Sequence, residues 1–238
     1  MAEAPSGQVP GAMTPRQMVG LGLRFLVWMV ILAGLLFAPA GRLDIPAFWV
    51  MWVLWAVYSA ISVLTLVRTD PSLIKERTRP GPGGKDPYTR FLAAIFFLVH
   101  WIVASLDVGR YHWSDTVPLT WQVAAFVGLA AALALTNWAV SVNRFYSSDA
   151  RIQRDRGHYV ITDGPYRFLR HPGYLSGIVM CICSPLALGS YYSGIPTLAL
   201  LPFFVRRLRI EERLLLAELE GYPEYAQRVR YRLLPGVW

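Results

Sequence analysis

The chain has 238 residues, of which 55% are hydrophobic and only 16% are charged. An ordinary soluble domain carries about 25% charged residues, so this chain has too few charges to cover a surface that faces only water. The composition excludes a soluble enzyme, a disordered protein and a fibrous protein, and two cysteines exclude a disulfide framework. A net charge of +8 is typical of a membrane protein whose basic residues face the cytoplasm and anionic lipid.

Five long stretches without Asp, Glu, Lys or Arg set the predicted topology. They cover residues 25–41, 45–67, 91–106, 116–143 and 171–205. A spanning helix needs about 20 mostly apolar residues, so each of the first four stretches predicts one membrane span. The first stretch could instead be a signal peptide, but the long segment before it favours a retained span.

The fifth stretch predicts a helical hairpin. Its 35 residues would form a helix of roughly 52 Å, whereas the hydrocarbon core is roughly 30 Å thick. The stretch also contains several prolines and glycines, which break helices. We therefore expect residues 174–188 to enter the membrane, residues 189–194 to turn, and residues 195–205 to return. An amphipathic helix that begins at Arg206 would follow and could lie on the membrane surface.

The basic residues orient this topology. If the N-terminus is cytoplasmic, Arg42 and Arg110 are the two basic residues in loops on the opposite side, as the positive-inside rule requires. We therefore expect the N-terminus and the C-terminal region to be cytoplasmic. Residues 1–15 are expected to be disordered, residues 16–140 to hold the first four spans, and residues 141–238 to carry the chemistry.

The segment 163–174 is the most informative cytoplasmic stretch, and it reads DGPYRFLRHPGY. Pro172 disfavours the α conformation at His171 and favours the first turn of a helix, so we expect the hairpin to begin near Pro172 with His171 near its N-cap. A helix start offers free N–H groups and a partial positive charge, which suit a carboxylate or phosphate. Tyr166 and Tyr174 could face a base or a cation. The alternative is a polar collar at the membrane boundary.

An acidic pair, Glu211 and Glu212, follows the hairpin. On a helix the two carboxylates project to different sides, so one could face water while the other turns inward to a polar ligand. The alternative is a solvated pair with arginine partners at helical spacing. His158, Glu211 and Asp163 are the nearby candidates for a general base, and none stands out. This favours slightly an acceptor that is already ionised near pH 7.

Five different short motifs follow one another along the C-terminal part of the chain. They are GPY at 164–166, RHPGY at 170–174, EE at 211–212, GYPEY at 221–225 and LP at 234–235. Together they resemble the isoprenylcysteine carboxyl methyltransferase family, whose relatives include the membrane phospholipid methyltransferases. The resemblance covers about residues 140–238. It implies an all-α polytopic membrane bundle of four single spans plus a C-terminal helical hairpin, with cytoplasmic C-terminal helices closing a cofactor pocket.

The resemblance implies an integral membrane methyltransferase that uses S-adenosyl-L-methionine and acts on a lipophilic acceptor, such as an isoprenylcysteine carboxylate or a lipid. It places the cofactor contacts on Gln153, His158, Tyr159, Val160, Ile161, Tyr166, His171, Pro172, Gly173, Tyr174 and Glu212. The family also aims a basic residue at the substrate carboxylate. Counting back from Glu212 reaches Leu208, which Arg207 and Arg209 flank, and we assign this catalytic role to Arg209.

The methyl acceptor stays open among a prenylcysteine, a phospholipid amine, an isoprenoid acid and a small thiol. Two other functions compete: a membrane NADPH-dependent reductase of the sterol type, whose C-terminal half is similar, and a non-enzymatic transporter or scaffold. A transporter needs ionisable or broken-helix features inside the membrane, which are rare in the first four stretches. The expected partners are the bilayer and a lipophilic or prenylated substrate, with no nucleic acid. We expect no metal, because Cys181 and Cys183 lie in an apolar helix without further ligands.

Overall fold

The computed structural model describes residues 15–69, 73, 86–147, 149–234 and 236. The predicted disorder of residues 1–15 falls almost wholly outside these residues. Within them the chain is helical, without strands. The helices are α1 (Pro15–Phe37), α2 (Pro46–Thr69), α4 (Pro87–Leu106), α5 (Leu119–Val142), α6 (Pro172–Ala187), α7 (Gly194–Ala199), α8 (Leu201–Glu218) and α9 (Tyr222–Arg228). A π-helical turn, η1 (Asp107–Tyr111), extends α4, and two 3-10 turns, η2 (Arg154–Arg156) and η3 (Gly164–Arg167), precede α6.

Four of the described helices are long and apolar enough to cross a membrane, which confirms the four predicted single spans. The candidate spans are Met18–Phe37, Pro46–Arg68, Phe91–Tyr111 and Leu119–Val142. The third is longer than predicted, because η1 continues α4 without a break. Helices α1, α2, α4 and α6 each start on a proline, a residue favoured at the first helical position because its missing N–H has no partner there anyway.

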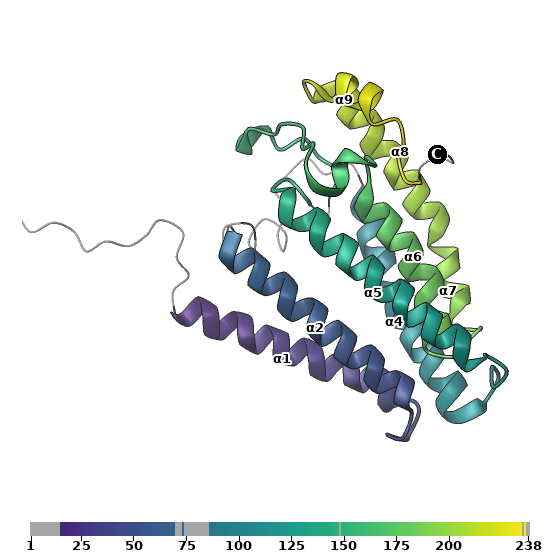
Figure 1. Ribbon diagram of the computed structural model, residues 1–238. Coiled ribbons are helices and arrows are strands. Elements are labelled where there is room, and N and C mark those ends of the chain that lie inside the picture. Colours follow the sequence, from purple (N-terminus) through teal and green to yellow (C-terminus); the bar gives the residue numbers. More distant parts are fainter. Residues whose placement is uncertain (1–14, 70–72, 74–85, 148, 235, 237–238) are drawn as a thin grey trace, which may run out of the picture.

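The helices form two groups (Figure 1). Helices α1 and α2 lie side by side at one edge, and the remaining helices form the main body. The buried core that joins the groups includes Leu32, Leu36, Phe48, Trp101 and Leu129. Within the body α5 and α6 approach closely, because a Cβ on Gly128 would lie 2.8 Å from Sγ of Cys183. Small residues allow such close helix packing in membranes.

The predicted hairpin is present, with its turn in residues 189–194. Gly189 adopts a φ of 78°, in the left-handed region that favours glycine, and ends α6. Helix α6 runs through Pro185, whose missing N–H leaves the carbonyl of Cys181 without its usual helical donor. The hydroxyl of Thr197, on the returning α7, donates to that carbonyl over 2.8 Å. The hairpin therefore supplies from its second arm the hydrogen bond that the proline removes from the first.

The returning arm differs from the prediction in one respect. The sequence places a separate surface helix from Arg206 onward, whereas α8 is continuous from Leu201 to Glu218. The break lies earlier, between α7 and α8 at Leu200, just before Pro202. Because no glycine or proline follows until Gly221, the apolar and arginine-rich parts form one rigid rod. This rod carries the acidic pair from the hairpin to the end of the bundle that holds α9 (Figure 1), here called the site end.

The opposite end, which holds the hairpin turn, is fastened by a buried polar network. Asp107 accepts hydrogen bonds from the hydroxyls of Ser114 and Ser190 at 2.6 and 2.5 Å. His100 contacts the carbonyl of Ser193 and the hydroxyl of Ser184 through its two ring nitrogens. Both His100 and Asp107 are fully buried. The network fixes the hairpin turn against α4 and η1, and so anchors α6 and α8 far from the site.

Candidate active site

A cavity of about 580 Å³ lies at the site end of the bundle. Small-molecule sites usually measure about 300–1,000 Å³. One part of its wall comes from the membrane helices, with Tyr58, Ser62, Leu66, Thr89, Ala93, Gly177, Met180 and Phe204. The rest is more polar, with Asn143, Tyr146, Arg151, His158, Tyr166, His171, Tyr174, Arg207, Glu211 and Tyr222. The cavity thus joins an apolar region between the helices to a polar region at the site end.

The start of α6 forms one side of the polar region. His171 is its N-cap and Pro172 its first residue, as the sequence predicts. The backbone N–H groups of Arg170 and His171 donate to the carbonyls of Tyr231 and Arg232, each over 3.0 Å. The C-terminal segment therefore lies alongside the entry to α6, a pairing that no sequence motif indicates.

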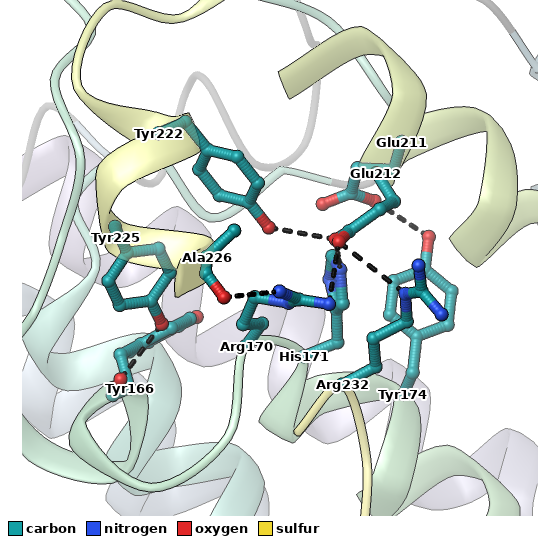
Figure 2. Close-up of polar contacts among 10 residues, drawn as sticks. All are labelled: Tyr166, Arg170, His171, Tyr174, Glu211, Glu212, Tyr222, Tyr225, Ala226 and Arg232. Carbon is teal, nitrogen blue, oxygen red and sulfur yellow. Dashed lines mark hydrogen bonds and ion pairs between the residues drawn. The ribbon is translucent and has the colours of Figure 1, made fainter. Parts of the chain in front are cut away.

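Glu212 is the centre of a buried hydrogen-bond cluster (Figure 2). Its Oε2 lies 2.6 Å from Nε2 of His171 and accepts the hydroxyl of Tyr222 over 2.9 Å. Its Oε1 lies 2.9 Å from an Nη of Arg170 and 3.5 Å from Nε of Arg232. Burial opposes ionisation of Glu212, but hydrogen bonds from His171 and Tyr222 outweigh it, and the pKa falls to about 2. The carboxylate is therefore ionised near pH 7 and links α6, α8, α9 and the C-terminal segment.

Glu211, the other member of the acidic pair, faces the cavity. The hydroxyl of Tyr174 donates to its Oε2 over 2.7 Å, and Nε of Arg207 donates to the same hydroxyl over 3.1 Å. Arg207 is only 8% exposed although it carries a charge. The two neighbouring carboxylates thus have different environments, because Glu212 is enclosed by protein donors while Glu211 forms part of the cavity wall.

The segment before α6 contributes an aromatic corner. The ring of His158 packs on that of Phe145 with centroids 4.4 Å apart, and Tyr159 meets Phe145 edge-on at 5.0 Å. Burial, together with the positive charges of Arg151 and Arg156, lowers the pKa of His158 to about 4. Its Nδ1 accepts the backbone N–H of Gln153. His158 is therefore neutral near pH 7, and it lines the cavity.

Helix α9 covers the polar region. Tyr225 donates through its hydroxyl to the carbonyl of Tyr166 over 2.8 Å, and Arg170 donates to the carbonyl of Ala226 over 3.0 Å (Figure 2). The hydroxyl of Tyr166 in turn accepts from Nδ2 of Asn143. These contacts join α9 to the end of α5 and to the entry of α6, so the lid over the polar region is held from several elements.

Residues 120–217 match the Isoprenylcysteine carboxyl methyltransferase (ICMT) family. The sequence-based resemblance is therefore confirmed over this segment. The motifs at 221–225 and 234–235 lie beyond it.

Relatives with curated names match the same part of the chain. The chain is 36% identical over 98 residues to a protein of Oryza sativa subsp. indica named "Probable protein-S-isoprenylcysteine O-methyltransferase". The matched region covers 38% of this chain and 48% of that protein. It is 28% identical over 92 residues to "Protein-S-isoprenylcysteine O-methyltransferase" of Schizosaccharomyces pombe. That matched region covers 38% of this chain and 39% of the relative. The chain therefore spans less than half the length of these relatives.

Most of the residues predicted to bind the cofactor line the cavity. They are His158, Tyr159, Val160, Ile161, Tyr166, His171, Pro172, Gly173 and Tyr174. Glu212 stands behind this wall, where its carboxylate meets protein donors. Gln153 is fully buried; its amide donates to the carbonyl of Phe145 over 2.6 Å and accepts from Arg156. Among the described residues, the cavity lining includes neither of these two side chains.

The structure also separates the two candidate arginines of the ICMT segment. Arg207 lines the cavity, whereas Arg209 is exposed on α8 and is not among the lining residues that the structure describes. Residues two apart on a helix point about 200° apart, so they cannot share one face. Arg207 and Glu211 are four residues apart and do share a face. That spacing is the sequence signal that could have indicated Arg207.

Proposed function

We propose that this protein is an integral membrane methyltransferase that uses S-adenosyl-L-methionine and acts on a lipophilic acceptor. The observation that carries the proposal is a cavity with two chemically different parts, lined largely by residues of the ICMT segment. A polar donor and an apolar acceptor could meet where the two parts join. The activity, the donor and the acceptor are all proposals for the chain as a whole.

The residues of the polar region suit the donor. The neutral His158 ring and its aromatic neighbours offer faces for stacking a base. The start of α6 offers a partial positive charge for a carboxylate, and Glu211 offers a negative charge for a cation. The donor would supply a methyl group bound to a positively charged sulfur.

Arg207, rather than Arg209, is our proposed partner for an acidic acceptor. It is buried, it lines the cavity, and Tyr174 holds its guanidinium in place. An acidic acceptor is ionised near pH 7 and needs no general base. The chain would then act by holding acceptor and donor in line and by excluding water, since alignment alone can provide much of the acceleration of such a displacement.

Glu212 would act through other residues. Its contacts with His171 and Tyr222 hold the start of α6 against α9, so we propose that it positions the donor-binding wall rather than contacting the donor. This differs from the direct contact that the family resemblance implies.

Binding to the purified protein tests the donor. We expect saturable binding of S-adenosylhomocysteine, measured by calorimetry in detergent, and none of NADPH. NADPH binding without S-adenosylhomocysteine binding would instead support the reductase. Incubating native membranes with a donor carrying a radiolabelled methyl group would then identify the acceptor.

A pair of variants tests the arginine assignment. We expect Arg207→Gln to raise the KM for an acidic acceptor about tenfold or more, because a hydrogen bond to a charged group contributes about 1.5–3 kcal/mol. Arg209→Gln, two residues away on the exposed side of α8, is the matched control and should change this KM less than about twofold. The reverse ranking would restore Arg209 to the site.

A further inference from the structure

The wall of the cavity contains residues from outside the ICMT segment. Thr89 and Ala93 of α4 line it, whereas the family match starts at residue 120. Just before α4 lies Asp86, the N-cap of this helix, with a side chain that is completely buried. A buried carboxylate beside a proposed substrate cavity needs compensation, because burial of an uncompensated charge is costly.

Three features compensate the charge of Asp86. The hydroxyl of Thr89 donates to Oδ2 over 2.5 Å, and an Nη of Arg206 lies 3.3 Å from Oδ1. The carboxylate also sits at the N-terminus of α4, where the helix dipole favours a negative charge. Burial opposes its ionisation, but Thr89 and Arg206 outweigh it and hold the pKa of Asp86 below the ordinary value. Asp86 is therefore a stable anion that ties α4 to α8.

The contacts of Asp86 lie next to the proposed acceptor site on both α4 and α8. On α4, Thr89 both donates to Asp86 and lines the cavity. On α8, Arg206 directly precedes Arg207, which lines the cavity. Burial disfavours the charge of Arg207, but Tyr174 and the carboxylates of Glu211 and Asp86 outweigh it and raise its pKa. Asp86 therefore contacts Arg206 directly and acts on Arg207 electrostatically.

We propose that Asp86 is a positioning residue for acceptor recognition: it holds Arg206 outside the cavity, offsets the repulsion between the two consecutive arginines, and so keeps Arg207 directed into the cavity. This inference rests on the proposed function. Asp86 contacts Thr89 and Arg206, whereas the proposed donor region is formed by His158, the start of α6 and Glu211. The loss of Asp86 should therefore weaken acceptor recognition and leave donor affinity intact. Acceptor specificity would then depend on a residue outside the ICMT segment.

The test compares Asp86→Asn, Arg206→Gln and the double variant with the wild type in detergent. The acceptor probe is N-acetyl-S-farnesylcysteine, and donor-site affinity is measured as the Kd of S-adenosylhomocysteine. We expect each single variant to raise the acceptor KM about tenfold, with the Kd changed less than about twofold. The double variant should be no worse than either single variant, because both act through one contact. Asp86→Glu should recover part of the loss.

An aspartate–arginine pair in the loop between α1 and α2 provides a matched control away from the cavity. Asp44 pairs with Arg42 over 2.7 Å, and both side chains are exposed. Asp44→Asn therefore removes a carboxylate from an aspartate–arginine pair away from the cavity and should leave both constants unchanged.

Two results would overturn the inference alone: an unchanged acceptor KM in both single variants, or a Kd that changes as much as the KM while the melting temperature is retained. If Asp86→Asn does not fold, Arg206→Gln decides by the same comparison, since the Arg206 side chain is 58% exposed. A wild-type protein that neither binds S-adenosylhomocysteine nor transfers a methyl group would overturn the proposed function and this inference with it.

Discussion

Two adjacent glutamates show how neighbouring residues acquire different roles in this protein. Glu211 faces the cavity and accepts from one tyrosine hydroxyl, while Glu212 turns into the protein and contacts donors from the entry of α6, from α9 and from the C-terminal segment. The difference follows from helical geometry, because consecutive residues on a helix point about 100° apart. The inward residue is therefore structural, and the cavity-facing residue is available for a ligand.

Removing the Glu212 carboxylate should destabilise the fold strongly. We expect Glu212→Ala to cost about 3–5 kcal/mol, because it leaves the buried Arg170 without its anionic partner. The melting temperature in detergent should fall, and S-adenosylhomocysteine should bind more weakly as α9 loosens. A variant with wild-type melting and affinity would contradict the central role of this cluster.

The lowered pKa of Glu212 predicts that the stability of the fold depends on pH. Its pKa is about 2 in the folded protein, below the ordinary value of 4.5. Folding therefore favours the ionised form, and the stabilisation is complete above about pH 4.5 and is lost as the pH falls toward 2. We expect the wild type to lose melting temperature between pH 5 and pH 3 more steeply than Glu212→Gln, which cannot ionise. Parallel curves for the two proteins would rule out this linkage.

At the scale of the elements, the start of α6 is fixed by close packing. Gly173, at the second position of the helix, faces Tyr146 of the preceding segment, and a Cβ there would lie 2.6 Å from the tyrosine Oη. Tyr146 itself lines the cavity. The absence of a side chain at Gly173 therefore allows Tyr146 to pack directly against the start of α6.

Gly173→Ala should displace Tyr146 and narrow the polar region. We expect the affinity for S-adenosylhomocysteine to fall about tenfold, in line with the roughly 1–3 kcal/mol cost of overpacking, as measured by calorimetry. Gly34→Ala is the control, since an added Cβ at this position in the last turn of α1 meets nothing within 4 Å. It should bind normally and be equally or slightly more stable, because alanine favours helix. Equal effects of both variants would exclude a specific role for the contact.

At the scale of the whole molecule, the bundle places its buried polar anchor and its candidate site at opposite ends. The hairpin turn is fixed by the Asp107 network at one end, and the cavity lies at the other end between α2, α4, α6 and α8. The continuous α8 rod connects the two ends. The positive-inside rule predicts that the site end, with its many arginines, is the cytoplasmic end.

Labelling of single cysteines tests this orientation. In a background with Cys181 and Cys183 replaced by alanine, we expect Asp115→Cys, at the turn end, to react with an impermeant maleimide on intact cells. Asp163→Cys, at the site end, should react only after the membrane is opened. Both positions are exposed. The reverse pattern would invert the topology and place the cavity on the outer side.

The sequence by itself determined the membrane architecture and the start of α6. Uninterrupted apolar stretches fix the spans, because the bilayer demands a minimum length and satisfied backbone groups. The His171–Pro172 pair fixes the start of α6, because proline restricts the residue before it and suits the first helical turn. These are local constraints, so they can be read from consecutive residues.

Only the tertiary structure decided which side chains meet. It turned Arg207 toward the cavity and Arg209 away, enclosed Glu212, joined Asp86 to α8, and brought the C-terminal segment to the entry of α6. A helix pattern shows that residues share a face, but which face is buried depends on the neighbours that pack against it. Those neighbours come from distant parts of the chain, so their contribution to the site has no local signal in the sequence.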